Sequence, residues 1–372
     1  MTAHKQDGTA GPAGGDVWVA TEETLDLINP AANPARSDCI RRFEFDGTRA
    51  GALRLSAEVC AEGITGPPGA ACMIFFNIEY AQGPVFWDTF LYPDTGSTPW
   101  RMLSCEARNR GAVRAVEMHV RFHAKGRLRL RHLKVETLAP WVDDAEGVVA
   151  IFGDSTDMTN YLPTEHRLGR RLELLLRDRF PDRRVDVQVL AEGGETLQRL
   201  VESGRLEREL KTLSRCDIAL IRYGLNDESK KAAPELFRKY LHAAYQAILA
   251  RFPAAKIVLS TTIPPCAEAY NRETRATAEL FKLPLIRLDE FIRRRSAAGE
   301  SDWHHQPGSR MGRHRDAPAP GNADGLAGDM HPNAFGAQMI AEHYFDVMEP
   351  MMVEKLGATA APGFHPPRTE SQ

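Results

Sequence analysis

The sequence predicts a two-domain protein in which an antiparallel β-sandwich precedes an α/β domain with a parallel sheet. One observation is a hydrophobic period of two over residues 17–136, where short turns separate the runs. Another is the change, after residue 144, to short apolar runs of strand length that alternate with helical patterns. The last is a Gly-Asp-Ser sequence, residues 153–155, that directly follows one of these apolar runs.

Length and composition bound the classes of protein to consider. The 372 residues are enough for two domains with separate cores. A net charge of -3 gives no electrostatic reason to expect a nucleic acid or an anionic membrane as partner. No apolar run approaches the roughly 18–20 residues that cross a bilayer, and residues 1–16 lack the apolar segment of a secretory signal. We therefore expect a cytoplasmic protein without a nucleic-acid or membrane partner; the oligomeric state is left open.

The cysteines do not indicate a metal site. Their spacing contains no Cys-x-x-Cys pair and no Cys/His ligand pattern, so we expect no structural zinc and no other metal. Most stand in apolar stretches and are interpreted as small buried side chains. Four of the six fall in the first third of the chain, which leaves one disulfide open there for an exported protein; the six are Cys39, Cys60, Cys72, Cys105, Cys216 and Cys266.

The predicted sandwich covers residues 17–140, after a tail of residues 1–16 that is expected to be disordered. The parity of the apolar positions changes between Leu130 and Leu133, which predicts a bulge or strand break near Arg131 and His132. Many short strands without a convincing helix are typical of an antiparallel sandwich. The strands are expected at residues 53–59, 72–80, 84–92, 100–105, 113–123 and 127–135.

This pattern is similar to the jelly-roll, galactose-binding-like modules found beside carbohydrate enzymes. The resemblance implies that exposed aromatic side chains stack on sugar rings, and the candidates are Phe86, Trp87, Tyr92 and Trp100. The alternative is that these aromatics fill the core of the sandwich, where most large aromatic side chains lie. A third interpretation is a module that packs against the second domain and binds no ligand.

The α/β domain is expected at residues 141–356, and a linker at residues 139–144 spans the boundary between the two domains. Residues 357–372 are expected to form a second disordered tail. Strands alternating with helices predict a parallel sheet with helices on both faces. The strands are expected at residues 148–152, 185–190, 218–223, 257–262 and 283–288, and the helices at residues 168–180, 197–213, 234–252, 272–281 and 334–351.

The Gly-Asp-Ser sequence brings Ser155 to the carboxyl end of a strand buried on both faces, where open α/β sheets place their ligands. Gly153 permits a tight turn there, and a serine in that position is a candidate nucleophile. The alternative is a helix N-cap, because Asp154 and Ser155 both cap well.

Two further motifs follow strands in the same way. Gly193 and Gly194, in Leu-Ala-Glu-Gly-Gly-Glu-Thr, end a strand and open a helix, so a backbone N–H there can approach a substrate oxygen. Asn226, in Tyr-Gly-Leu-Asn-Asp, can direct its amide N–H₂ toward a developing oxyanion. The alternatives are a plain strand–helix turn for the glycines and an Asx-turn or helix cap for Asn226.

A fourth motif, Gly-Asp-Met-His-Pro-Asn at residues 328–333, precedes the last predicted helix. Its His331 can act as general base and acid at neutral pH, although a lone surface histidine is the alternative. All four motifs lie at strand ends or in the loop before the closing helix, so we expect them at one edge of one sheet.

With these four blocks in this order, the sequence from about residue 147 to residue 354 resembles the SGNH (GDSL-type) hydrolase family. The resemblance implies a flavodoxin-like, three-layer α/β/α domain and an esterase that needs no cofactor. It also implies that Ser155 is the nucleophile and His331 the general base. The oxyanion donors are then the N–H of Ser155, the N–H of Gly194 rather than Gly193, and the side chain of Asn226.

The sequence departs from the family at the third triad position. The family's acid stands three residues before the histidine, where this chain has Gly328, whereas Asp329 stands two residues before it. We expect Asp329 to orient His331, with Asp324 as the weaker candidate and a Ser-His dyad held by a main-chain carbonyl as the alternative.

The residues between the last two predicted helices add one more expectation. Residues 301–325 are rich in Gly and Pro and carry Trp303, three histidines and three arginines. They are interpreted as a lid or substrate-binding loop, with a solvated loop as the alternative, and a metal site is not expected.

The family resemblance of the four blocks implies a serine esterase that removes a small acyl group, of acetyl size. The resemblance of the sandwich to sugar-binding modules implies that the acyl group is carried by a carbohydrate or glycoconjugate. A lipase, thioesterase or acyltransferase that uses the same serine is the alternative within the family. The alternative from another class is a glycan-binding protein with a degenerate hydrolase domain.

Overall fold

The structure is a computed structural model. It describes residues 17–30, 36–49, 51–65, 72–81, 86–91, 93–107, 111–122, 124–137, 145–160, 162, 166–264, 268–298 and 331–357, without the side chains of residues 36–39, 86–90 and 296. The expected tails, the linker and the 301–325 insertion therefore lie outside the described residues, apart from Gly357. The chain divides into two compact units, the first covering Met1–Thr65 and Ala71–Trp141 and the second including Val142–Gln372.

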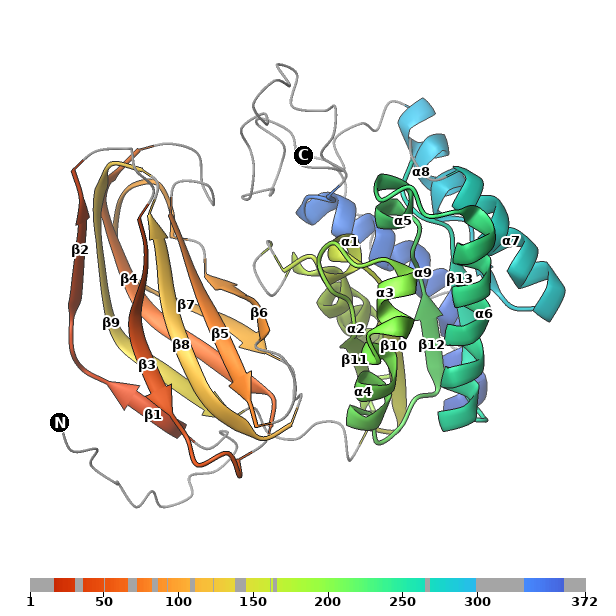
Figure 1. Ribbon diagram of the computed structural model, residues 1–372, viewed down its shortest axis with the longest axis horizontal. Coiled ribbons are helices and arrows are strands. Elements are labelled where there is room, and N and C mark those ends of the chain that lie inside the picture. The colour runs from red at the N-terminus through yellow and green to blue at the C-terminus, as the bar shows by residue number, and fades with distance from the viewer. Residues whose placement is uncertain are drawn as a thin grey trace. The chain divides into compact units, whose positions relative to one another are not determined.

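The first unit contains two antiparallel sheets (Figure 1). In one sheet the order is β1-β9-β4-β7, and β2 also pairs with β9. In the other the order is β3-β8-β5-β6. The strands are β1 (Val17–Thr21), β2 (Leu25–Asn29), β3 (Arg36–Glu44), β4 (Leu53–Ile64), β5 (Cys72–Tyr80), β6 (Phe86–Leu91), β7 (Gly96–Ala107), β8 (Val113–Phe122) and β9 (Gly126–Thr137).

One hydrophobic core joins the two sheets. Alternate side chains of β4, such as Leu55, and of β5 and β8, such as Ile74 and Met118, are buried in the same cluster, so the unit is a β-sandwich, as the period of two predicts. The bulge predicted in the last strand is confirmed. Ser56 of β4 pairs with Lys134 and Glu58 pairs with Arg131, which leaves an extra residue on β9.

Trp100 does not belong to this core, although it was one of the aromatics considered for it. The side chain is half-buried, and the guanidinium carbons of Arg131 and Arg129 lie 4.3 Å and 5.3 Å from its ring centroid. The side chains of Phe86 and Trp87, and all of Tyr92, lie outside the described residues, so neither interpretation of them is tested. Among the described cysteines, Cys60, Cys72, Cys105 and Cys216 are buried free thiols.

The second unit is built on one parallel sheet with the order β11-β10-β12-β13-β14. Numbered from its first strand, this is the order 2-1-3-4-5 of flavodoxin-like folds, as expected. The central strand β10 is buried along its whole length, which explains its continuous apolar sequence. The strands are β10 (Gly147–Phe152), β11 (Val185–Val189), β12 (Ile218–Ile221), β13 (Lys256–Ser260) and β14 (Leu285–Ile286).

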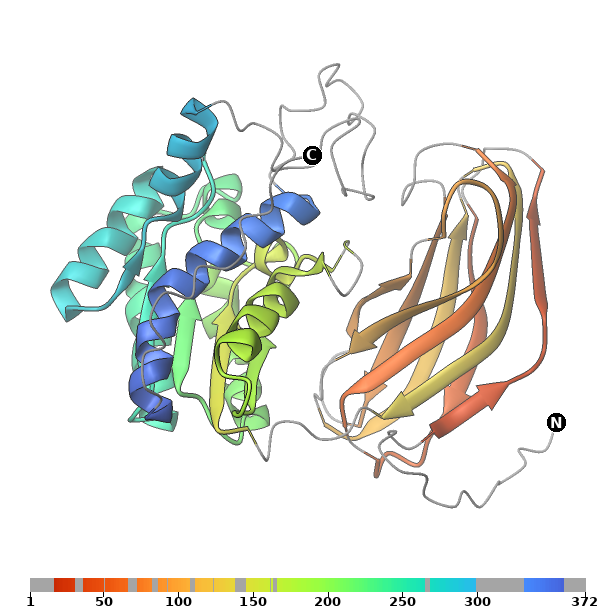
Figure 2. The same ribbon diagram turned by 180° about the vertical axis from the view of Figure 1, so that it is seen from behind.

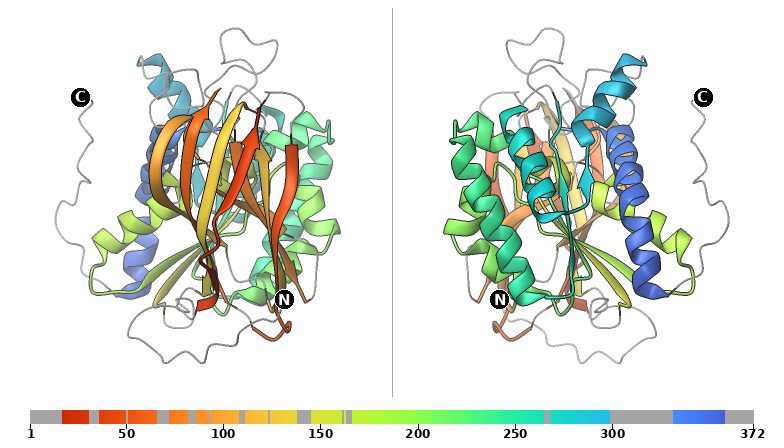
Figure 3. Two further views of the ribbon diagram at one scale, coloured as in Figure 1. Left: turned by 90° about the vertical axis from the view of Figure 1, so that its left-hand side faces the viewer. Right: turned by 90° about the vertical axis from the view of Figure 1, so that its right-hand side faces the viewer.

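Helices cover both faces of this sheet. On the face seen in Figure 1, α3, α4, α6 and α7 share a core with side chains of β10, β12 and β13. On the opposite face, α2 and α9 pack together (Figure 2), and the blue helix α9 and the green α6 flank the sheet (Figure 3). The helices are α1 (Ser155–Met158), α2 (Leu168–Arg179), α3 (Leu197–Glu202), α4 (Arg205–Thr212), α5 (Leu225–Ser229), α6 (Pro234–Arg251), α7 (Glu268–Phe281), α8 (Leu288–Ala297) and α9 (Ala334–Leu356).

Two predicted elements of this unit need correction, and short helices were missed. The helix expected over residues 197–213 is two helices, because Gly204 adopts a φ of 69° between α3 and α4. The strand expected over residues 283–288 is only Leu285–Ile286, and the unpredicted helix α8 follows it. A short helix, α5, also begins directly after the tight turn at Gly224. No helix in the described part of the chain is long and apolar enough to cross a membrane.

Candidate active site

The turn after β10 presents Ser155 at the start of a short helix. Asp154 is the N-cap of α1, and its Oδ1 accepts hydrogen bonds from the backbone N–H of Thr156, at 2.9 Å, and from its hydroxyl, at 2.7 Å. The preceding glycine is required sterically, because a Cβ on Gly153 would lie 2.0 Å from Oδ2 of Asp157. The capping interpretation therefore holds for Asp154, while Ser155 faces a different partner.

That partner is His331, although 176 residues separate the two in the sequence. Nε2 of His331 lies 2.9 Å from Oγ of Ser155, within hydrogen-bonding distance. His331 stands just before α9, whose N-cap Asn333 accepts a 2.8 Å hydrogen bond from the backbone N–H of Gly336. Both members of the pair are half-buried, so the contact is shielded but remains open to a substrate. This arrangement suits transfer of the serine proton to imidazole.

Asn226 supplies a buried amide donor just after β12, the neighbour of β10 in the sheet. It lies in α5, which follows β12, and its Nδ2 is buried without a hydrogen-bond partner among the described residues. Buried polar groups are nearly always hydrogen-bonded, so an unpaired donor here is unusual. The helix cap expected as its alternative role belongs to Gly224. Because β10 and β12 are neighbours at the point where strand order reverses, Asn226 and Ser155 follow the two strands where such folds bind ligands.

Gly194 lies in the turn between β11 and α3. Its φ of +70° is the left-handed conformation that favours glycine, and no atom lies within 4 Å of the position that a Cβ would take. The residue is exposed. The turn ends at Thr196, which caps α3 by accepting a 3.1 Å hydrogen bond from the N–H of Arg199. The open surroundings leave room for a ligand at this glycine.

Asp227 connects the Asn226 segment to the Gly194 segment. Its Oδ1 accepts a 3.1 Å hydrogen bond from the backbone N–H of Leu197, the first residue of α3. Burial raises the pKa of this carboxyl to about 6, although backbone N–H groups work in the opposite direction. Asp227 is thus a buried acid that ionises less readily than an ordinary aspartate, and no motif in the sequence singles it out.

A second buried acid, also missed from the sequence, lies behind the Gly194 turn. Oε2 of Glu195 accepts a 2.8 Å hydrogen bond from the hydroxyl of Tyr223 and forms an ion pair with Arg205. Arg205 also donates a 2.8 Å hydrogen bond to the carbonyl of Leu190, at the end of β11. Burial raises the pKa of Glu195 to about 7, although the charge of Arg205 opposes the shift. The two ends of the turn are therefore joined through side chains.

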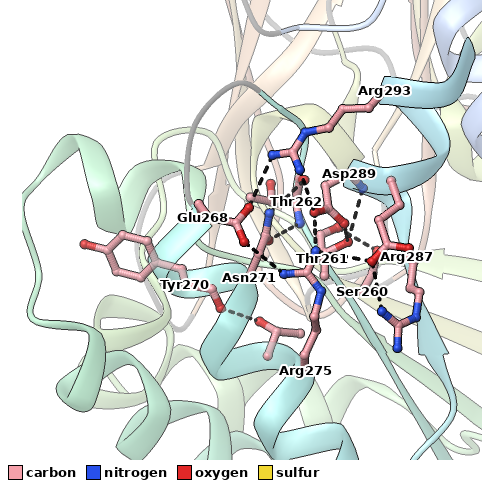
Figure 4. A network of polar contacts seen from close by, with 12 residues as sticks. Ser260, Thr261, Thr262, Glu268, Tyr270, Asn271, Arg275, Arg287, Asp289 and Arg293 are labelled. Carbon is pink, nitrogen blue, oxygen red and sulfur yellow. Dashed lines mark hydrogen bonds and ion pairs between the residues drawn. The ribbon is translucent and has the colours of Figure 1, made fainter. Parts of the chain in front are cut away.

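A polar network fixes the loop after β13, at the same edge of the sheet (Figure 4). Asn271 of α7 accepts a 2.8 Å hydrogen bond from the backbone N–H of Thr262. The hydroxyl of Thr261 lies 2.6 Å from Oδ1 of Asp289, which also pairs with Arg275. These contacts hold the fourth strand end of the sheet in place.

Other candidates from the sequence are not described. Asp329, Gly328 and Asp324 lie outside the described residues, as does the 301–325 insertion, so the third triad position is untested. Within the described ranges, no group of three or more His, Cys, Asp or Glu side chains is arranged to hold a metal ion.

Comparison with known proteins places the second unit in a family. The model of the GDSL-like Lipase/Acylhydrolase family matches residues 151–339, just over half of the chain. No curated protein matches.

Among solved structures, the protein YXIM of Bacillus subtilis is 15% identical, with 91% of each chain covered and a TM-score of 0.45. The salicylyl-acyltransferase SsfX3 from a tetracycline biosynthetic pathway is 15% identical, with 89% of this chain and 98% of that chain covered and a TM-score of 0.45. An active-site mutant of a family two carbohydrate esterase from Clostridium thermocellum is 11% identical, with 89% and 99% covered and a TM-score of 0.41. From the family match, the chain belongs to the GDSL-like lipase/acylhydrolase family.

Proposed function

We propose that the protein is a serine esterase that removes a small acyl group, of acetyl size, from a carbohydrate or glycoconjugate. The observation that carries the esterase part is the 2.9 Å contact between Oγ of Ser155 and Nε2 of His331. The unpaired amide donor of Asn226 supports it, because acyl transfer needs hydrogen-bond donors for an oxyanion.

The mechanism follows from these groups. Nε2 of His331 takes the hydroxyl proton as Oγ of Ser155 attacks the ester carbonyl carbon. The Nδ2 of Asn226 and the N–H groups of Gly194 and Ser155 bind the resulting oxyanion, at about 3 kcal/mol for each well-placed donor. The imidazolium of His331 then protonates the leaving alcohol as its bond to carbon breaks. Water, deprotonated by the same imidazole, hydrolyses the acyl-enzyme and releases the acid.

Asp329 is our proposal for the third member of the triad, two residues before His331. A carboxylate on the second imidazole nitrogen fixes the tautomer and stabilises the imidazolium.

The carbohydrate part of the proposal rests on the first unit. Its two antiparallel sheets, β1-β9-β4-β7 with β2 also paired to β9, and β3-β8-β5-β6, share one hydrophobic core. This two-sheet architecture supports a sugar-binding module of the jelly-roll type in the same chain as the esterase unit. Arg129 and Arg131 lie against the ring of Trp100, so less of the ring is available to stack on a sugar.

The test is hydrolysis of p-nitrophenyl esters from acetyl to octanoyl by the wild type and by Ser155→Ala. We expect turnover that falls steeply with acyl length and is lost in Ser155→Ala, with an unchanged circular dichroism spectrum. Equal turnover by the folded variant would contradict the serine mechanism.

Two further measurements separate the alternatives. Activity that persists to octanoyl would point to a lipase or thioesterase, and acyl-sugar products formed with an added sugar acceptor would point to an acyltransferase. A panel of acetylated glycans tests whether the alcohol of the ester is a carbohydrate. Release of acetate from these glycans supports the proposal. Glycan binding by a protein that hydrolyses none of these esters would instead support a binding protein with a degenerate hydrolase unit.

A further inference from the structure

A buried ion pair lies beneath the Gly-Asp-Ser turn and takes no part in the mechanism above. Nε of Arg222 donates a 2.8 Å hydrogen bond to Oδ2 of Asp157, and both side chains are almost completely buried. Arg222 comes directly after β12, on the segment that continues to Asn226, whereas Asp157 belongs to α1. The pair therefore joins the nucleophile segment to the segment of the amide donor.

The same guanidinium contacts one neighbour of the nucleophile directly and is linked to the other through it. Nη2 of Arg222 donates a 2.7 Å hydrogen bond to the hydroxyl of Thr156, and that hydroxyl donates a 2.7 Å hydrogen bond to Oδ1 of Asp154. Ser155 lies between these two residues in the chain. The chain of contacts thus fixes the backbone on each side of Ser155 while leaving its hydroxyl free for His331.

The helix that follows His331, α9, is the third segment that the network connects. The hydroxyl of Tyr344, in α9, donates a 3.1 Å hydrogen bond to Oδ1 of Asp157 and is fully buried. Asp157 also fills the space beside Gly153, where a side chain would collide with its carboxylate. One carboxylate therefore contacts the nucleophile turn, the end of β12 and α9.

Stability alone is a poor reason for such an arrangement. Removing two charges from water is costly, and well-packed apolar residues of similar volume often serve equally well or better in place of a buried ion pair. Directional contacts do, however, fix the relative positions of three segments more narrowly than apolar packing does.

We propose that Arg222 is a positioning residue, which through Asp157, Thr156 and Tyr344 holds the Ser155 hydroxyl in line with His331 and Asn226. The inference rests on the proposed esterase function. A misplacement of about 1 Å between reacting groups can lower the rate about 100-fold, so the network needs no contact with substrate to matter.

The experiment replaces the pair by apolar residues in the double variant Arg222→Met/Asp157→Leu. The matched control is Arg179→Met/Glu349→Leu, which removes a different ion pair, at 2.6 Å, between α2 and α9. Two milder variants are Arg222→Lys, which keeps the charge, and Tyr344→Phe, which removes one hydrogen bond. For each folded variant we would measure kcat and KM with p-nitrophenyl acetate and the rate at which a fluorophosphonate labels Ser155.

We expect kcat and the labelling rate to fall about 100-fold in the Arg222/Asp157 double variant, with KM changed less than about threefold. Arg222→Lys should recover part of the loss, Tyr344→Phe should lose about three- to tenfold, and the control should stay within about threefold. A folded double variant with near-wild-type kcat, or a control that loses as much, would overturn the inference. If the double variant does not fold, unchanged kcat in both Arg222→Lys and Tyr344→Phe would overturn it.

Failure of the proposed function gives a different result. In that case the folded wild type itself is not labelled and hydrolyses no ester. A wild type that is labelled, with variants labelled equally fast, contradicts only the positioning role.

Discussion

Nζ of Lys230 donates a 2.6 Å hydrogen bond to the carbonyl oxygen of Gly194. Lys230 caps the short helix α5, which carries Asn226, so the contact joins the segments of the two proposed oxyanion donors. Asp227 makes a second connection between these segments, to the N–H of Leu197. Two side-chain contacts therefore connect the segments of Gly194 and Asn226.

Replacing Lys230 with Met removes the contact to the Gly194 carbonyl at little cost to the fold, because Lys230 is exposed. We expect kcat for p-nitrophenyl acetate to fall about three- to tenfold, as for a net hydrogen-bond contribution of about 1 kcal/mol. Lys231→Met, the same change at the next exposed position, serves as the control and should leave kcat unchanged. Equal kcat in the two variants would contradict the role of this contact.

Asn226→Ala removes the amide donor that has no partner among the described residues. We expect kcat to fall about 100- to 1,000-fold with little change in KM, as for the loss of one oxyanion donor. Gln338→Ala, which removes an amide paired with Glu342 on α9, is the control and should retain activity. A loss confined to KM would show that Asn226 binds substrate but not the oxyanion.

Asp227 predicts a pH dependence of stability. Its pKa is about 6 in the folded protein and about 4 in an unfolded chain, so the folded state binds more protons between these values. Its contribution to the free energy of unfolding is complete below about pH 4 and is lost as the pH rises through 6.

We therefore expect Asp227→Asn, which keeps an acceptor for Leu197, to match the wild type near pH 4 and to be more stable near pH 8, by up to about 3 kcal/mol. Urea unfolding at the two pH values measures this difference. The opposite sign, with the wild type more stable at pH 8, would show that the carboxylate is stabilised by its surroundings.

The third triad position can be tested by comparing two aspartates. Asp329→Asn should lower kcat about 10⁴-fold if its carboxylate orients His331, as for loss of a triad acid. Asp324→Asn should stay within about threefold. A large loss in Asp324→Asn alone would reassign the acid, and full activity of both variants would support a Ser-His dyad.

Local patterns in the sequence predict much of this fold and the positions of the motifs. The continuous apolar run of β10 predicts a strand buried on both faces, and the parity change between Leu130 and Leu133 predicts the bulge in β9. These features depend on neighbouring residues, whose periodicity the sequence displays directly.

The remaining features depend on contacts between distant residues. The split at Gly204 has a local signal, because glycine in a helical pattern lowers its stability. In contrast, Asp157 and Tyr344 have no local signal, since their contact spans 187 positions. Arg222 has a weak local signal, because it is a charged residue directly after the apolar strand β12. Pairing of distant buried charges requires the fold to be known.

The central claim is that Ser155 is a nucleophile activated by His331, and labelling with a fluorophosphonate tests it most directly. We expect the wild type to be labelled at a single site, which mass spectrometry of the digested protein locates at Ser155. Ser155→Ala should remain unlabelled, and His331→Ala should be labelled far more slowly. A folded wild type that stays unlabelled, or Ser155→Ala labelled as fast as the wild type, would contradict the account.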